Sequence, residues 1–342
     1  MCSSDLGFGI VWKIPTNGRF NNSWKADGDS SQIAISPGNR WITLENKETT
    51  QIFDGFNPRN PPLVWTNSNP IAGLGFDDRS PELKVLFQNG IFQGVKLPVG
   101  GNTRILFPLD RPGIHSALLE PPGDRWIALT KDARLITVPA RQHREGITNH
   151  NHGASHSRVL RPPPFDCKFV QSPDGSSFVL IASPQNMVAP DVHRFNGLWI
   201  GRSPFKNGSE IPLEFPGNCS SAAYSRDGRW IAAGTWDGAY RIFNAADGSP
   251  ATPLRRQDAP IRCVTLDRSG RVLITGSTDR HIRFWDLQSG EPVAPDIEMQ
   301  ASVAHVQTIP SGHLLSLGND CSVALWRADD WRPIFKIGRA HV

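Results

Sequence analysis

Residues 259–295, with the sequence APIRCVTLDRSGRVLITGSTDRHIRFWDLQSGEPVAP, indicate the fold of the whole chain. β-Branched and aromatic residues alternate with polar ones in three short runs, and we expect strands at Ile261 to Leu266, Val272 to Gly276 and His281 to Asp286. The turn residues between them are Asp267 to Gly270 and Ser277 to Arg280. Because three or four short strands leave one apolar face in water, such a sheet must pack against similar sheets.

Copies of this unit recur along the chain at a nearly constant interval. Trp285 closes the third expected strand, and bulky apolar residues with the same role follow one another about 41 to 43 residues apart, with one longer step of about 62. This column consists of Trp12, Phe53, Val95, Val138, about Ile200, Phe243, Trp285 and Trp326. A period of about 40 to 45 residues with four strands per repeat is typical of a propeller blade.

A second column lies six residues before the first, in the turn between the second and third strands. Its members are Asp132, Asp237, Asp279 and Asp320, with Asn89 and Lys47 as weaker substitutes. Two columns at a fixed offset indicate a structural repeat. We expect these aspartates to be hydrogen-bonded turn residues rather than catalytic groups.

The repeated unit resembles a WD40-repeat blade, and Trp285-Asp286 is the dipeptide that names this family. The resemblance covers nearly the whole chain, strongly after Asn218. It implies an all-β, seven-bladed WD40-type β-propeller with an extra N-terminal half blade. It also implies a hydrogen-bonded network that joins a turn Asp, a third-strand Trp, a Ser or Thr of the second strand and a His, although Gln257 stands where the His would lie. The expected structural residues are Asp132, Asp237, Asp279, Asp320, Trp285 and Trp326.

The expected domain limits follow from the blade count. Residues 7–30 would form the third and fourth strands of the half blade, and residues 31–336 the seven-bladed propeller. Residues 1–6 and 337–342 resemble translated sequencing-adapter DNA, and we expect both to be artefacts that flank an internal piece of a longer protein.

Composition argues against several classes of function. The net charge is +4, but the Lys and Arg residues are scattered among acidic ones, so we expect no nucleic-acid partner. Five cysteines without a CxxC pair predict neither a disulfide framework nor a zinc site, and they favour a cytoplasmic protein. No apolar run of about 18 residues is present, so no membrane span is expected.

Two insertions interrupt the repeats. Residues 140–158 carry His143, His150, His152 and His156, which could bind metal, but their Asn, Gly, Ser and Arg neighbours favour a solvated loop. The second insertion, Ser183 to Asn196, lies between a second and a third strand. There it could contact a partner or be only a tolerated surface excursion.

No sequence motif for hydrolysis, phosphate binding, zinc proteolysis or dinucleotide binding is present, so we expect no enzyme and no cofactor. The leading hypothesis is a non-catalytic scaffold for protein partners. Its candidate binding residues are Trp236, Arg262, Arg280, His281 and Asn319. The alternative is a propeller enzyme or small-ligand sensor that uses the axial channel, where His115 and His305 are isolated polar candidates.

The linkers GSPATPL and GEPVAP resemble those of bacterial WD-repeat proteins that carry signalling domains. This resemblance implies a larger bacterial signalling or regulatory protein.

Overall fold

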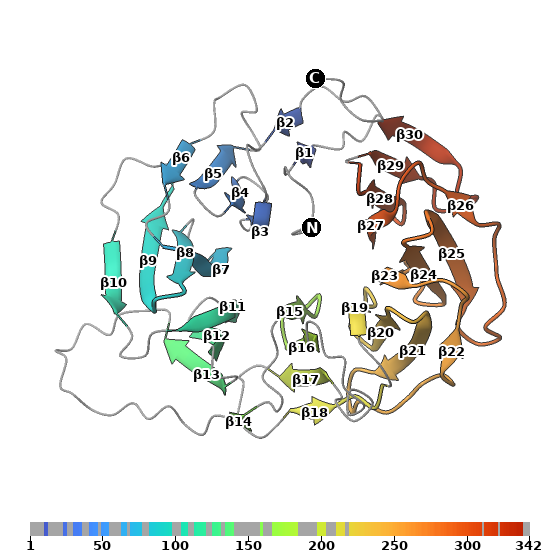
Figure 1. The fold of residues 1–342 in the computed structure, drawn as a ribbon, viewed down its shortest axis with the longest axis horizontal. Coiled ribbons are helices and arrows are strands. Elements are labelled where there is room, and N and C mark those ends of the chain that lie inside the picture. The colour runs from blue at the N-terminus through green and yellow to red at the C-terminus, as the bar shows by residue number, and fades with distance from the viewer. Residues whose placement is uncertain are drawn as a thin grey trace. The chain divides into compact units, whose positions relative to one another are not determined.

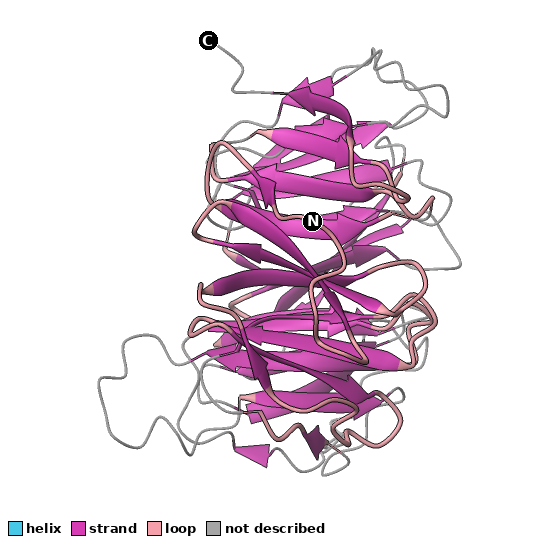
Figure 2. Cartoon of the chain, turned by 90° about the vertical axis from the view of Figure 1, so that its right-hand side faces the viewer, coloured by secondary structure: helices cyan, strands magenta, loops and turns pink. Residues whose placement is uncertain are grey.

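The computed structural model consists of strands and turns, and its described residues contain no helix (Figures 1 and 2). The structure describes residues 10–12, 23–25, 30–35, 41–46, 49–54, 63–66, 69–76, 82–97, 104–108, 113–120, 125–130, 134–139, 158–159, 166–183, 197–202, 210–215, 219–309, 311–320 and 322–337. The chain divides into two compact units, Met1–Pro163 with Pro204–Gly208, and Pro164–Ser203 with Ser209–Val342.

The first unit holds a strand pair and three four-stranded antiparallel sheets. The pair is β1 (Ile10–Trp12) and β2 (Ser23–Lys25). The sheets are β3 (Ser30–Ile35), β4 (Trp41–Asn46), β5 (Thr49–Asp54) and β6 (Leu63–Thr66); β7 (Ile71–Phe76), β8 (Glu82–Phe87), β9 (Ile91–Lys96) and β10 (Arg104–Pro108); and β11 (Ile114–Glu120), β12 (Arg125–Thr130), β13 (Arg134–Pro139) and β14 (Arg158–Val159). That β1 and β2 belong to a half blade stays a prediction.

The second unit holds four further sheets of the same kind. They are β15 (Asp166–Gln171), β16 (Ser177–Ser183), β17 (Leu198–Arg202) and β18 (Ile211–Pro212); β19 (Cys219–Tyr224), β20 (Trp230–Thr235), β21 (Ala239–Asn244) and β22 (Arg255–Arg256); β23 (Ile261–Leu266), β24 (Val272–Ser277), β25 (His281–Asp286) and β26 (Ile297–Glu298); and β27 (Val303–Thr308), β28 (Leu314–Gly318), β29 (Val323–Trp326) and β30 (Pro333–Ile337). Seven four-stranded antiparallel sheets confirm the predicted fold class, an all-β, seven-bladed β-propeller.

The hydrophobic cores lie between consecutive sheets rather than inside one sheet. In the second unit, one cluster joins β16 and β17 to β20 and β21, the next joins β20 and β21 to β23 and β24, and the third joins β24 and β25 to β27, β28 and β29. Second strands such as β20 and β24 are buried at five of six positions because both of their faces are covered. Each sheet therefore stabilises its neighbours by removing their apolar faces from water.

The predicted column of bulky residues is confirmed by strand register. Phe243 pairs with Ile231, Trp285 with Leu273 and Trp326 with Leu314, and these three second-strand residues occupy equivalent positions. Phe243, Trp285 and Trp326 each pack in the core shared with the preceding sheet.

In the column of bulky residues, the member expected at about Ile200 lies one residue later, at Gly201. In the β15–β18 sheet, Phe178 occupies the second-strand position, and its register partner is Gly201, not Ile200. A Cβ atom built on Gly201 would lie 2.1 Å from the ring of Phe178. The Phe178 ring, which is 3% exposed, therefore fills the volume that a third-strand side chain fills in the other sheets.

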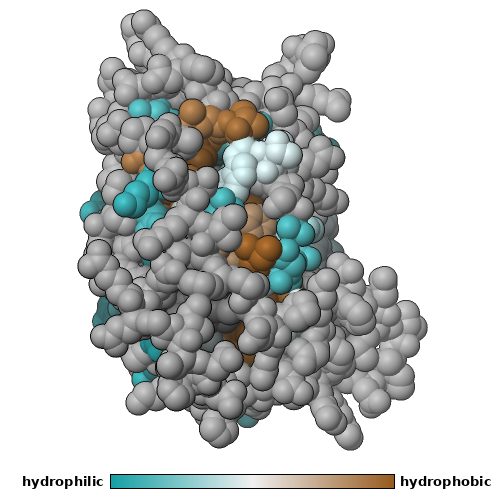
Figure 3. Space-filling model, turned by 90° about the vertical axis from the view of Figure 1, so that its left-hand side faces the viewer, coloured by the Kyte–Doolittle hydropathy of each residue, from teal (hydrophilic) through white to brown (hydrophobic). Residues whose placement is uncertain are grey.

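Among the residues that the structure describes, few large hydrophobic side chains reach the surface. The described residues include five such side chains: Leu63, Val64, Trp236, Val293 and Ile334. Figure 3 shows one face of the molecule, on which described hydrophobic residues are visible in brown between residues drawn in grey.

The exchange between Phe178 and Gly201 predicts a large effect from a small substitution. We expect Gly201→Ala to lower the free energy of unfolding by about 1–3 kcal/mol, because the new methyl group and the buried ring cannot share the same space. Phe178→Leu in the same chain should recover part of the loss. Chemical denaturation of the single and double variants measures both effects, and an unchanged midpoint for Gly201→Ala would contradict this packing.

Candidate functional site: the second-to-third turns of the last three sheets

The candidate surface is built from two kinds of loop that lie together. One kind is the turn between the second and third strands of a sheet, and the other is the connector that leads into the next sheet. The Gln257 amide donates to the Gly238 carbonyl at 3.0 Å, and the Met299 amide donates to the Arg280 carbonyl at 2.8 Å. Ser302 donates its hydroxyl to the Thr278 carbonyl at 2.7 Å. These bonds hold each turn against the connector that follows it.

Three of the five candidate binding residues are exposed in these turns, and two are less exposed than expected. Trp236 is 46% exposed, and Arg280 and Asn319 are also exposed. Arg262 lies in β23 at a shift of register between Ile261 and Cys263, and it is half-buried.

His281 begins β25 and is also half-buried, because its ring nitrogen Nδ1 lies 2.9 Å from the Asp279 carbonyl oxygen. Arg262 and His281 are thus only partly accessible, and their role in partner binding stays a prediction. Trp236, Arg280 and Asn319 form the remaining candidate surface, which we call the turn face.

Arg280 has an unusual backbone conformation. Its φ is 75°, whereas the equivalent turn position of the preceding sheet is Gly238, with φ 83°. Both amides close the same turn, Gly238 on the Thr235 carbonyl and Arg280 on the Ser277 carbonyl. A side chain in this region costs about 1 kcal/mol, and such strain persists where the surrounding structure imposes it.

Exposed ion pairs border the turn face. Arg256 Nη1 lies 2.7 Å from Asp237 Oδ2, and Arg280 Nη2 lies 3.0 Å from Glu298 Oε1. All four side chains are more than half exposed, so these pairs contribute little to stability and can be exchanged for contacts with a partner.

Asp279 is held by a stronger and less exposed pair. Arg283 donates to both of its carboxylate oxygens, at 2.6 and 3.2 Å, and also contacts Asp296 at 3.1 Å. Partial burial raises the pKa of Asp279, but hydrogen bonds from Arg283, the His281 amide and Ser277 outweigh it and lower the pKa to about 2. Asp279 is therefore ionised at neutral pH and serves the structure of its turn.

The hydrogen-bonded network predicted around Trp285 is present in part. Trp285 Nε1 donates to Thr275 Oγ1 at 3.2 Å, and Thr275 donates to Gln257 Oε1 at 2.8 Å. Gln257 Nε2 then donates to the Ala259 carbonyl at 3.0 Å. Gln257 thus takes the place of the expected His, while Asp279 is bound to Arg283 instead of joining this chain.

The neighbouring sheets vary the same arrangement. Trp326 Nε1 donates to Ser316 Oγ at 2.8 Å, and Ser316 lies 3.5 Å from the Met299 sulfur. In the β19–β22 sheet, Phe243 stands at the position of Trp285 and makes an apolar contact instead, because its ring packs edge-to-face on Phe215.

The turn aspartates of these sheets are also hydrogen-bonded. Asp237 accepts from Thr235 and Arg256, and Asp320 accepts from Ser322 at 2.6 Å. These two aspartates are thus hydrogen-bonded within their own turns, whereas Asp132 lies outside the described residues.

The two insertions lie outside the described residues, apart from Ser183, which ends β16, and Arg158, which begins β14. Among the described residues no group of three or more His, Cys, Asp or Glu side chains could hold a metal ion.

Burial raises the pKa of the thiols of Cys219 and Cys263 to about 12, so both are protonated at neutral pH. Burial also lowers the pKa of His305 to about 4. None of the described residues belongs to a helix of membrane-spanning length and hydrophobicity.

Comparisons with known proteins agree with the geometry. The family profile described as WD domain, G-beta repeat, matches residues 210–244 and 248–286, which include strands β18 to β25 and the whole Trp285 network. No curated protein matches the sequence. Among solved structures, the chain is similar to the computationally designed Ika8 protein, with 12% sequence identity and a TM-score of 0.61 over 91% of this chain and 88% of that one. At this identity the likeness shows the fold alone.

The Trp285 network predicts a difference between two substitutions of one residue. We expect Thr275→Val to lower the free energy of unfolding by about 1–3 kcal/mol, because it leaves the buried Gln257 carbonyl and the Trp285 N–H without their shared hydroxyl. Thr275→Ser keeps the hydroxyl and should cost less than half as much. Equal losses in the two variants would mean that the methyl group, not the hydroxyl, stabilises this core.

The lowered pKa of Asp279 predicts a pH dependence. Its stabilising effect is present above the unfolded pKa of about 4 and is lost as the pH falls from about 4 to about 2. Solvent screening reduces the effect of this partly exposed group, so we expect Asp279→Asn to cost about 1 kcal/mol at pH 7 and close to nothing at pH 2. Urea unfolding at both pH values measures the difference, and an equal cost at the two would contradict it.

Proposed function

We propose that this WD40-repeat protein is a non-catalytic scaffold that binds a protein partner through the turn face. The observation that carries the proposal is the exposure of Trp236, a large aromatic side chain, at the tip of a tight turn, directly before Asp237, which pairs with Arg256. Tryptophan and arginine are the side chains most enriched at the energetic centres of protein interfaces.

The arrangement of the turn face supports binding with little loss of entropy. Its turns are closed by backbone hydrogen bonds and held to the connectors, so the exposed side chains stand on fixed backbone. A preformed surface reduces the ordering cost of association. The strained backbone of Arg280 supports a role for its side chain, because a glycine would adopt the same turn without that cost.

We further propose a setting in the bacterial cytoplasm, within a larger signalling or regulatory protein. The linker resemblance supports the signalling role. Among the described cysteines, Cys219 and Cys263 are buried thiols that form no disulfide bond, as expected in a reducing compartment. The enzyme and ligand-sensor alternatives receive no support from a specific feature of the described residues.

Affinity capture with matched variants tests the turn face. The bait proteins are the unmodified chain, Trp236→Ala, Arg280→Gly and the control Val293→Ala, which alters an equally exposed hydrophobic side chain in the connection between β25 and β26. We expect Trp236→Ala to reduce recovery of the main partner at least tenfold, the loss of about 1.4 kcal/mol or more that defines an important interface residue. Val293→Ala should recover the partner normally.

Arg280→Gly separates a binding role from a structural one. Removing the side chain also removes the backbone strain, so the stability should stay within about 1 kcal/mol of the original while partner recovery falls. If all four folded proteins recover the same partner in equal amount, the turn face is not the binding surface. If Val293→Ala alone loses it, the partner binds near the β25–β26 connection instead.

A further inference from the structure

The surroundings of the turn face are acidic, although the chain as a whole is basic. The second-to-third turns at 235–238, 277–280 and 317–320 and the segments 256–262 and 296–302, which lead into β23 and β27, hold six acidic side chains. These are Asp237, Asp258, Asp279, Asp296, Glu298 and Asp320. The basic side chains are Arg256, Arg262, Arg280 and, beside them in β25, Arg283. Six carboxylates against four guanidinium groups give this surface a net charge of −2, whereas the whole chain carries +4.

The excess of negative charge is concentrated around Arg283. This arginine contacts Asp279 at 2.6 Å and Asp296 at 3.1 Å, and Asp258 is close enough to attract the same guanidinium group. The Arg283 side chain is 18% exposed, whereas those of Asp279 and Asp296 are 31% and 42% exposed. One partly buried cation therefore serves three more exposed carboxylates, and it compensates only one of their charges.

Asp258 is the carboxylate of this group that is open to a ligand. Its side chain is exposed, and none of the residues that the structure describes forms a hydrogen bond or an ion pair with it. The segment that carries Asp258 lies directly on the Trp236 turn. The Gln257 amide donates to the Gly238 carbonyl at 3.0 Å, and a Cβ built on Gly238 would lie 2.9 Å from the Ala259 carbonyl oxygen. We call the surface formed by Trp236 and Asp258 the Trp236–Asp258 patch.

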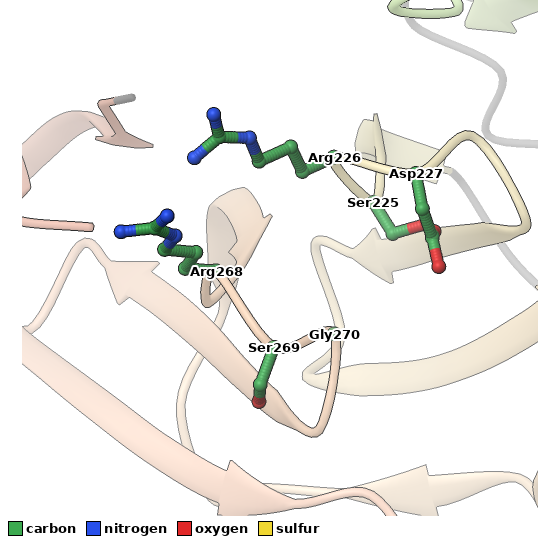
Figure 4. A pocket seen from close by; sticks show the side chains of 6 residues that line it. All are labelled: Ser225, Arg226, Asp227, Arg268, Ser269 and Gly270. Atoms are coloured by element: carbon green, nitrogen blue, oxygen red, sulfur yellow. The ribbon is translucent and has the colours of Figure 1, made fainter. Parts of the chain in front are cut away.

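The opposite ends of the same two sheets carry the reverse charge. Their first-to-second turns, at 225–229 and 267–271, hold four arginines and two aspartates. Figure 4 shows two of these arginines, Arg226 and Arg268, extending from the neighbouring turns. A positively charged segment is therefore attracted to the Trp236 end of these sheets and repelled from the other end.

We propose that the Trp236–Asp258 patch binds a basic segment of the partner protein, with a Lys or Arg side chain placed over the Trp236 ring. This inference rests on the proposed function, because it names the chemistry of the partner at that surface. The face of a tryptophan ring attracts a cation, and Asp258 and the carboxylates around Arg283 attract the same charge. Complementary charge of this kind selects one class of partner and speeds association, whereas an acidic segment would place like charges together.

Three short labelled peptides test the charge of the ligand. They share one sequence and differ only at alternate positions, which hold Lys and Arg in the first, Gln in the second and Glu in the third. Fluorescence anisotropy with the intact chain measures their affinities. We expect the basic peptide to bind at least about tenfold more tightly than the other two, and its affinity to fall severalfold as the ionic strength rises.

Matched variants assign the binding to the patch. We expect Trp236→Ala to weaken binding of the basic peptide about tenfold and Asp258→Asn about threefold. The control Asp329→Asn changes the net charge by the same amount at the other end of the last sheet, where the neighbouring Ala328 amide donates to His313, and it should alter binding less than about twofold. Asp258→Lys should abolish binding of the basic peptide and increase the affinity for the Glu peptide, a gain that misfolding cannot produce.

Three results would overturn the basic-segment proposal. They are binding of the Gln or Glu peptide as tightly as the basic one, equal losses in Asp258→Asn and Asp329→Asn, and no binding of the basic peptide below about 1 mM. Affinity capture with Trp236→Ala decides the proposed function separately. If capture falls while the peptides show no preference for basic residues, the turn face binds a partner of other chemistry. If Trp236→Ala captures the partner normally, the turn face itself is contradicted, whatever the peptides show.

Discussion

The fold depends on one constraint: each four-stranded sheet has two apolar faces, and among the described residues only other sheets cover them. Burial is therefore shared, and each of the three core clusters formed by described residues of the second unit contains residues from two consecutive sheets. The bulky third-strand residue is the clearest expression of this constraint, because Phe243, Trp285 and Trp326 each fill the space between their own sheet and the one before it. A sheet whose apolar faces must both be covered can be stable only as a member of a series.

Much of this could be predicted from the sequence because it depends on local periodicity. Alternating apolar residues predicted the strands around Trp285, and the spacing of the bulky residues predicted that similar sheets repeat along the chain. The replacement of the expected His by Gln257 could also be anticipated, since an amide can both donate and accept. The structure confirms that Gln257 hydrogen-bonds Thr275, which in turn accepts from Trp285.

What could not be predicted depends on side chains that reach across strands or sheets. Phe178 fills the third-strand position from the second strand, so no pattern within β17 could reveal it. Asp279 binds Arg283 instead of the Trp285 network because Arg283 offers two donors at close range.

The exchange of Phe178 and Gly201 has a consequence for recombination among the repeats. If a third strand were transplanted into this sheet from one of its neighbours, its bulky residue would meet the Phe178 ring, and the reverse transplant would leave an empty space where Trp285 or Phe243 had been. The smallest segment that can be moved between sheets is thus the hairpin of second and third strands together. Duplication or shuffling of this chain would preserve packing only where it respects that module.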